Sequence, residues 1–227
     1  MMQSLDNLKF GKWLRLYHTL SPSTIGYGGR GGLGIKVIKS INLGDSCNQV
    51  HLSLSNHLGS HVDAPRHFSN DGLAVNDYPI NDWFFYNPYL INVPVQEREI
   101  LSVARFESVL KDCSGLDILL IRTGFENFRN EKKYWEQSPA FEPGLANYLS
   151  KRFSSLRAIG LDTISISSYQ HRELGRQAHK AFLGSNIRIF EDLSLREVPI
   201  GQLKLVIGFP ILFDQADGAP CTIVALV

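Results

Sequence analysis

The sequence predicts a single α/β or α+β domain that spans residues 1–227 and is built on a mixed β-sheet with few helices. Short segments rich in Val, Ile and Leu recur along the chain, each bounded by Gly, Asp, Asn or Pro, as is typical of strands. Helical patterns are fewer and lie among these segments, which favours a mixed fold over an all-β fold. With 227 residues, 44% of them hydrophobic, and no linker-like stretch, the chain can bury one sizeable core.

The expected elements follow from local pattern. The segment 50–54 alternates apolar and polar residues, which is the period of a half-buried strand. The helical pattern at 174–183 is followed by Gly184 at a C-cap position. The full set of expected strands is 35–38, 50–54, 89–95, 118–122, 158–161, 187–190, 205–207 and 222–227, and the expected helices are 103–111, 143–152 and 174–183.

Charge and hydropathy exclude several classes of function. The chain has 23 Lys and Arg against 22 Asp and Glu and no basic run, so we expect no nucleic-acid partner. Residues 1–11 lack the apolar core of a signal peptide, and no apolar run approaches the roughly 20 residues that cross a bilayer. We therefore expect a cytoplasmic protein without a membrane partner.

The three cysteines, Cys47, Cys113 and Cys221, are odd in number and lack CxxC spacing. This pattern suggests neither a disulfide framework nor a thiolate zinc site. We expect all three to be buried as small hydrophobic residues.

The glycine-rich stretch at 26–31, GYGGRG, matches the letters of a GxGxxG dinucleotide fingerprint. That motif requires a strand before it and a helix after it. Here a Ser- and Pro-rich segment precedes the glycines and a β-like segment follows them. We interpret the stretch as a flexible turn or a loop that covers a substrate.

The segment 57–68, HLGSHVDAPRHF, holds three of the seven histidines together with a carboxylate. Gly59 and the nearby Pro65 argue against a helix, so we expect a loop that begins just beyond the strand at 50–54. Such a loop can direct His57, His61 and Asp63 at one point, and this ligand set suits Zn, Mn or Fe(II). Surface histidines would be the alternative, but the density of the cluster favours a metal.

A second group of ligands is expected from elsewhere in the chain, since three from one loop leave a metal partly open. His179 lies on the predicted helix at 174–183, and Glu191 ends an apolar strand. An ordinary solvated carboxylate is the alternative for Glu191. The remaining histidines, His18, His51 and His171, are expected to be structural.

These residues resemble the cyclase family of metal-dependent hydrolases, which includes bacterial kynurenine formamidases and isatin hydrolase. The family motif is HxGTHxDxPxHF, from which residues 57–68 depart only in having Ser60 for Thr. The similarity continues in GLDT at 160–163, in the twelve-residue spacing from His179 to Glu191, and in DGAP at 217–220. It weakens at 17–21, YHTLS, where family members usually carry an aspartate.

The resemblance implies a barrel-like core of the swivelling β/β/α type. It implies that His57, His61 and Asp63 bind one metal and that Asp63, His179 and Glu191 complete or bridge a second, with Zn or Mn as one or two ions per chain. It also implies that His67 is the catalytic acid and base. Relatives of this kind typically form homo-oligomers, either dimers or tetramers.

The function expected on this basis is cleavage of a C–N bond in an aryl formamide or small cyclic amide, as in kynurenine formamidase and tryptophan catabolism. A small aromatic or cyclic amide is therefore the expected substrate. Two alternatives stay open: a lactone or other cyclic-substrate hydrolase on the same site, and a non-catalytic, metal-dependent small-molecule binding protein. His67 beside the ligands favours an enzyme, because a binding module needs no proton shuttle.

Aromatic residues supply candidates for the walls of a substrate pocket. The run from Trp83 to Tyr86, flanked by Tyr78 and Tyr89, could line a pocket, although such runs more often belong to a core or a subunit interface. Tyr27, the aromatic residue nearest to the place where formamidases have a Trp, and Phe182 are further candidates.

Overall fold

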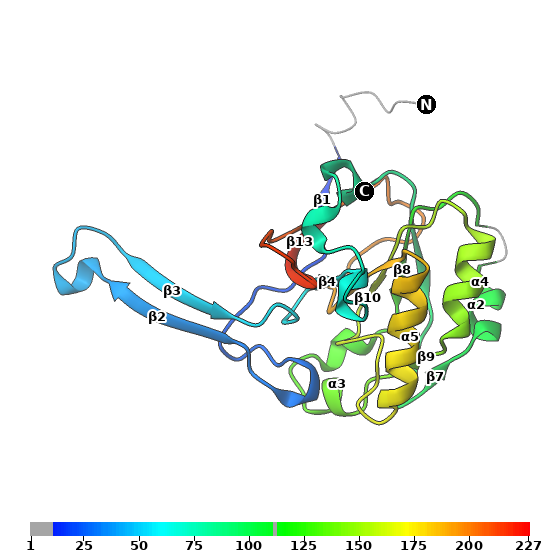
Figure 1. Ribbon diagram of the computed structural model, residues 1–227, viewed down its shortest axis with the longest axis horizontal. Helices are drawn as coiled ribbons and strands as arrows, with labels where there is room; N and C mark the ends of the chain where they lie inside the picture. The colour runs from blue at the N-terminus through cyan, green and yellow to red at the C-terminus, as the bar shows by residue number, and fades with distance from the viewer. Residues whose placement is uncertain (1–10, 111–112) are drawn as a thin grey trace.

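The computed structural model describes residues 11–110 and 113–227. Most of the strands in these residues belong to one mixed sheet (Figure 1). The members of this sheet are β1 (Trp13–Arg15), β4 (His61–Asp63), β5 (Phe84–Phe85), β6 (Pro88–Asn92), β8 (Ile118–Arg122), β10 (Ala158–Leu161), β11 (Arg188–Glu191), β12 (Leu205–Pro210) and β13 (Gly218–Leu226). Their order is β5-β12-β13-β4-β11-β10-β8-β6, with β1 paired to β13. Pairing is parallel from β6 to β11 and antiparallel from β11 to β5.

The sheet curls into a nearly closed, barrel-like core. Phe85 on one edge strand and Leu90 on the other belong to the same buried apolar cluster. Side chains from opposite edges can share a cluster only if the sheet bends round to bring them together. The expected α/β fold with a mixed, barrel-like sheet is confirmed.

Strand β8 shows how the sequence separates the two apolar layers. Its residues 118–121 are all buried, as the unbroken apolar run predicts for a strand covered on both faces. Leu119 and Ile121 pack into the cluster beneath the helices, whereas Ile118 and Leu120 pack into the barrel interior. This alternation is the period of two of a β-strand.

Four α-helices complete the described part of the domain: α2 (Val103–Val109), α3 (Lys133–Glu136), α4 (Gly144–Arg152) and α5 (Arg172–Gly184). Helices α2, α4 and α5 lie together on one side of the molecule (Figure 1). The short strands β7 (Ile100–Leu101) and β9 (Ala140–Phe141) form a separate parallel pair. No helix among the described residues is both long enough and apolar enough to cross a membrane.

Strands β2 (Leu33–Lys39) and β3 (Gln49–Leu54) form an antiparallel hairpin that extends away from the body of the domain (Figure 1). We call residues 33–54 the arm. Its side chains are exposed on both faces, so the half-buried strand expected at 50–54 is wrong, although the strand itself is present. The alternation of apolar and polar residues is that of a strand, but none of the other described residues buries either face.

The predicted elements agree closely with the structure, with a few corrections. All eight expected strands are present, and the helix expected at 103–111 ends at Val109, with residue 111 outside the described residues. Helix α5 begins two residues before the expected 174 and ends at Gly184, so Ser185 rather than the glycine is its C-cap. Cys221 is buried as expected, Cys113 is partly buried, and Cys47, near the tip of the arm, is exposed, contrary to expectation.

Candidate metal centre

The histidine segment does not remain a loop throughout. His61, Val62 and Asp63 form β4, a central strand whose neighbours are β11 and β13. Gly59 precedes it with a φ of 67°, and a side chain there would overlap Leu20. The tight bend at Gly59 therefore carries the chain from the arm into the sheet, so the expectation of an irregular loop is wrong for residues 61–63.

Asp63 lies at the centre of the cluster and is 1% exposed. Its Oδ1 is 2.8 Å from Nδ1 of His57 and 3.4 Å from Nε2 of His61. Its Oδ2 is 3.5 Å from Nε2 of His179, which reaches the site from α5. The strand, the preceding bend and the helix thus bring three imidazoles to one carboxylate.

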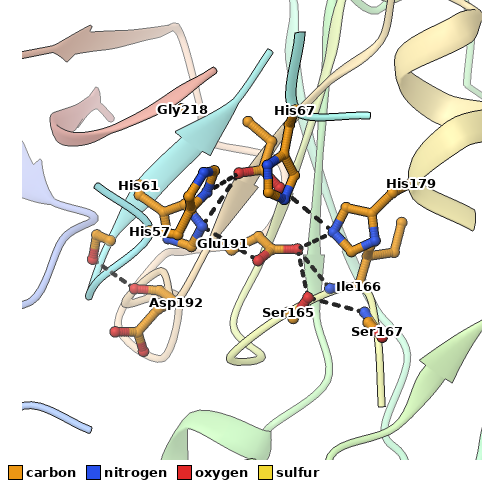
Figure 2. Close-up of polar contacts among 12 residues, drawn as sticks. His57, His61, His67, Ser165, Ile166, Ser167, His179, Glu191, Asp192 and Gly218 are labelled. Carbon is orange, nitrogen blue, oxygen red and sulfur yellow. Dashed lines mark hydrogen bonds and ion pairs between the residues drawn. The ribbon is translucent and has the colours of Figure 1, made fainter. Parts of the chain in front are cut away.

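Glu191 supplies the second buried carboxylate, at the end of β11 and 3% exposed. Its Oε2 is 3.4 Å from Nε2 of His61, and its Oε1 is 3.5 Å from Nε2 of His179. Ser165 Oγ and the Ile166 backbone N–H donate hydrogen bonds of 3.0 and 2.7 Å to Oε1. Figure 2 shows His61 and His179 on either side of this carboxylate.

Two of the imidazoles are oriented by backbone carbonyls. Nδ1 of His61 is 2.8 Å from the Gly59 carbonyl, and Nδ1 of His179 is 2.8 Å from the Gly175 carbonyl. Because a carbonyl only accepts, each Nδ1 carries a proton and donates it to the backbone, and each Nε2 is directed at the carboxylates. This is the orientation that metal-bound histidines have when their other nitrogen is hydrogen-bonded.

The electrostatics of the cluster favour a positive charge. Burial alone lowers the pKa of His57 and of His179, but the neighbouring carboxylates outweigh burial and raise both to about 10. Burial likewise raises the pKa of Asp63, yet the charge of His57 and hydrogen bonds from the imidazoles hold it well below its usual range. A buried site that attracts protons so strongly also attracts a metal cation.

A further observation shows that the residues of the cluster fit a divalent metal. Oδ2 of Asp63 is buried and has no hydrogen-bond partner, which is rare for a buried carboxylate oxygen. Ligand atoms lie within 4.8 Å of one another in two groups, one of His57, Asp63 and His67 and one of His61, Asp63 and Glu191. Asp63 belongs to both groups, and the set of nitrogen and oxygen donors without sulfur suits Zn or Mn.

His67 lies beside the cluster, in the 3-10 turn Pro65–His67. Its ring centroid is 4.0 Å from that of His57, and its Nδ1 is 2.9 Å from Oδ2 of Asp217. Asp217 also contacts Nε2 of His57 at 2.9 Å. The sequence showed Asp217 only as part of a turn, so its approach to the two histidines was not anticipated.

A pocket of about 440 Å³ opens over the cluster. Its aromatic lining consists of Tyr27, Phe68 and Tyr169, so Tyr27 lines the pocket, whereas Tyr169 was not anticipated. The stretch 26–31 forms part of this wall and leads into β2 rather than a helix, which excludes the dinucleotide fingerprint. Three arginines, Arg30, Arg172 and Arg176, also line the pocket.

The other aromatic candidates lie elsewhere. Trp83 and Phe85 are buried in the barrel interior, and Phe182 is buried beneath the helices. Tyr86 is exposed, and none of the residues from Trp83 to Tyr86 lines the pocket. This run therefore belongs to the core and surface rather than to the site.

The three histidines expected to be structural lie outside the pocket lining. His51 is exposed on the arm, and His171 is the N-cap residue of α5. The backbone N–H of His18 donates to Ser60 Oγ, which in turn donates to the Asp192 carbonyl. Ser60, the one departure from the family motif, thus ties β4 to the residue that follows Glu191.

Comparison with known proteins shows the family to which this chain belongs. A family model described as "Putative cyclase" matches residues 14–168. The chain belongs to the cyclase family. The match includes His57, His61, Asp63 and His67, while His179, Glu191 and Asp217 lie beyond it.

Relatives of known sequence and structure agree with membership of the cyclase family. The chain is 30% identical over 219 residues to kynurenine formamidase from Bacillus anthracis, covering 94% of this chain and 96% of the relative. Isatin hydrolase A from Labrenzia aggregata has a TM-score of 0.81 at 21% identity, covering 96% of this chain and 94% of that one. An isatin hydrolase bound to the product analogue thioisatinate has the same TM-score at 17% identity, covering 97% and 94%. These structures share the fold of this cyclase-family chain.

Proposed function

We propose that this protein is a metal-dependent hydrolase that cleaves the C–N bond of an aryl formamide or small cyclic amide, as a kynurenine formamidase. The observation that carries the proposal is the group of two buried carboxylates and three imidazoles, two of them buried, in which Asp63 Oδ2 has no hydrogen-bond partner. Such a group is costly to bury unless a cation completes it. Relatives named kynurenine formamidase, aligned over almost the whole chain, support the choice of reaction.

The proposed metal ligands are His57, His61, Asp63, His179 and Glu191, with Zn or Mn as one or two ions per chain. Asp63 is the residue that two ions would share, because its two oxygens face different imidazoles. A divalent ion held there would supply Lewis acidity, which activates water and polarises a carbonyl. The Nε2 atoms of His61 and His179 are held ready for it by the backbone carbonyls described above.

His67 is the proposed proton donor and acceptor. When water adds to the amide carbon and the C–N bond breaks, the leaving nitrogen must receive a proton, because an amide anion is a poor leaving group. His67 lines the pocket, and its Nδ1 is engaged by Asp217, which leaves Nε2 for exchange with the substrate. An imidazole transfers protons in this way near neutral pH.

The pocket lining supports a substrate with an aromatic ring and a carboxylate. Tyr27 and Tyr169, with ring centroids 6.2 Å apart, lie on the wall of the pocket. Arg172 and Arg176 are four residues apart on α5 and lie on the same face of the helix as His179. Guanidinium groups outside a metal centre suit the amino-acid carboxylate of N-formylkynurenine, a group that isatin lacks.

The arm supports a homo-oligomer, a dimer or a tetramer. Seven large apolar residues of the arm are exposed, among them Leu43 at 84%, Val37 at 61% and Ile41 at 57%. An apolar surface of this kind on a projecting hairpin is typical of contact with a second copy of the chain. A cytoplasmic location, as expected from the sequence, is part of the same proposal.

The test of the proposed function is a substrate panel assayed with protein loaded with Zn²⁺ or Mn²⁺. N-formylkynurenine is compared with formanilide, isatin and an aromatic lactone, and each is also assayed after chelator treatment. We expect metal-dependent formate release from N-formylkynurenine to have the highest kcat/KM. Turnover of the lactone alone, or tight binding of an amide without turnover by metal-loaded protein, would contradict the proposal.

The role of the arginines is tested in the same panel. Replacing both Arg172 and Arg176 by Ala should raise KM for N-formylkynurenine about tenfold, since a charge-assisted hydrogen bond contributes about 1.5–3 kcal/mol and about 1.4 kcal/mol corresponds to a factor of ten. KM for formanilide, which has no carboxylate, should not change. Equal effects on both substrates would reject carboxylate recognition.

A further inference from the structure

We propose that Asp217 is a positioning residue, which orients the metal ligand His57 and the proton donor His67 through a single carboxylate oxygen. The inference rests on the proposed function, because it assigns a role within the same site. Oδ2 of Asp217 is 2.9 Å from Nε2 of His57 and 2.9 Å from Nδ1 of His67. The two rings lie 4.0 Å apart, 32° from parallel, so one oxygen spans both edges.

The carboxylate of Asp217 is itself held in place. Its Oδ1 accepts a hydrogen bond of 2.7 Å from the side-chain amide of Asn56, the residue before His57. The Asp217 carbonyl accepts a 2.9 Å bond from the backbone N–H of Ala64, the residue after Asp63. Asp217 is therefore tied on both sides to the segment that carries the ligands, although it is 150 residues from His67 in the sequence.

The next residue explains why the turn has this composition. Gly218 begins β13 and is paired in register with Asp63. A Cβ at Gly218 would overlap the His57 ring, with Nδ1 of that ring only 2.9 Å away. Glycine at 218 leaves room for the imidazole, and aspartate at 217 binds its far edge. Asp217 and Gly218 together therefore fix the position of the His57 imidazole.

The hydrogen bonds to Asp217 fix which nitrogen of each imidazole faces away from it. An ionised carboxylate only accepts, so His57 donates from Nε2 and His67 donates from Nδ1. Nδ1 of His57 faces the metal centre, 2.8 Å from Asp63 Oδ1, where a bound metal would replace the proton that the two groups share. His67 presents its remaining nitrogen to the pocket.

One shared oxygen makes the two roles dependent on each other. A shift of Asp217 moves the metal ligand and the proton donor together, so their separation is preserved. Removal of the carboxylate frees both rings to rotate and to exchange tautomers. Groups of this kind behind metal-bound histidines typically contribute 10–100-fold in metal affinity or activity.

The test compares Asp217→Asn and Asp217→Ala with Asp214→Asn, a matched control at an exposed aspartate of the same loop. We expect Asp217→Asn to lower kcat about 10–100-fold per bound metal with KM changed less than about twofold, and to weaken Zn²⁺ affinity about 10–100-fold. Asp217→Ala should have larger effects, and the control none. Unchanged kcat per bound metal would overturn the proposal, since a purely structural residue would alter folding and metal content alone.

A second variant and a spectroscopic measurement keep the test decisive. If the Asp217 variants do not fold, Asn56→Ala removes the support of the carboxylate and should give a smaller loss of the same kind. Nitrogen-15 NMR of Zn²⁺-loaded protein should show His67 with its proton on Nδ1, and this tautomer should no longer dominate in Asp217→Asn. This measurement needs no substrate, so absence of formate release by the wild type would reject the proposed function and leave the positioning of His67 separately tested.

Discussion

His61 on β4 and Glu191 on β11 face each other in register across the sheet, with Nε2 of the imidazole 3.4 Å from Oε2 of the carboxylate. Both side chains are buried, at 4% and 3% exposure. The pair joins the local histidine segment to a strand about 130 residues later in the chain. Backbone pairing, rather than side-chain flexibility, therefore fixes the distance between these two proposed ligands.

Loss of the Glu191 charge should weaken metal binding. We predict that Glu191→Gln weakens Zn²⁺ or Mn²⁺ binding by more than about 100-fold, because it removes a charged ligand and leaves His61 and His179 without their partner. Ser165→Ala keeps the Glu191 charge and removes the hydroxyl that donates to Glu191 and accepts from the Ser167 backbone N–H, so it should weaken metal binding by only about tenfold. Metal content and competition with a chelator measure both effects.

The matched control for this pair of variants is Glu173→Gln, at an exposed carboxylate on α5. Its metal affinity should equal that of the wild type. Full metal binding by Glu191→Gln would remove Glu191 from the set of ligands.

His67 should matter for turnover far more than for metal. We predict that His67→Ala retains metal within about tenfold in affinity and loses about 10²–10⁴-fold in kcat, which is the usual contribution of a positioned acid and base. Formate release and metal analysis on the same preparation separate the two effects. Near-normal kcat would exclude His67 from proton transfer, whereas loss of metal in step with activity would make it a ligand.

Metal affinity should rise with pH. In the metal-free protein burial lowers the pKa of His57 and His179, but the carboxylates raise both to about 10, so both imidazoles are protonated at pH 7. Metal binding must displace these protons, so the dissociation constant should fall by up to about tenfold per pH unit for each proton released between pH 6.5 and 9. Calorimetry in buffers of different ionisation enthalpy counts the protons, and a result of zero would contradict this account.

The raised pKa values of His57 and His179 also make the stability of the metal-free protein depend on pH. Because the folded-state pKa of each imidazole lies above its unfolded value near 6.5, the stabilising contribution is fully present below pH 6.5 and is lost as the pH rises towards 10. Chelator-treated protein should therefore lose stability across this range relative to the variant His179→Gln. Parallel pH profiles for the two proteins would argue against the raised pKa of His179.

The arm should control assembly. We predict that the double substitution Val37→Glu with Leu43→Glu converts the oligomer to a monomer. A buried apolar side chain contributes about 1.5–3 kcal/mol, so the loss of two corresponds to a rise of at least about 100-fold in the dissociation constant. Light scattering after size-exclusion chromatography measures the mass. Tyr86→Ser, at another exposed large residue, is the control and should leave the mass unchanged. A monomeric wild type would reject the proposed contact.

The sequence alone predicted the parts of the fold in which local pattern and burial agree. The segments 118–122 and 158–161 correspond to β8 and β10 residue for residue, because every residue in them except Arg122 is apolar and buried, as in strands that are covered on both faces. β4 was missed because it is three residues long and two of them are His61 and Asp63. Its strand conformation depends on pairing with β11 and β13, which no local pattern records.

The candidate site was predictable to the extent that its residues are close in sequence or share a family spacing. His57, His61, Asp63 and His67 form one dense motif, and the structure brings His179 and Glu191 to them. Asp217 and Tyr169 were not recognised, because an aspartate in a turn and a lone tyrosine carry no signal of their own. In the arm, the alternation of apolar and polar residues predicted a strand correctly, but it did not show that both faces of that strand are exposed.

Amide hydrolysis by this protein should depend on a metal held in the cluster around Asp63. The most direct test removes metal with a chelator, adds Zn²⁺ or Mn²⁺ stepwise, and follows bound metal per chain together with formate release from N-formylkynurenine. We expect no activity without metal, a rise in activity in proportion to the metal bound, and saturation at one or two ions per chain. Full activity in the metal-free protein, or saturation with metal that produces no formate, would contradict this expectation.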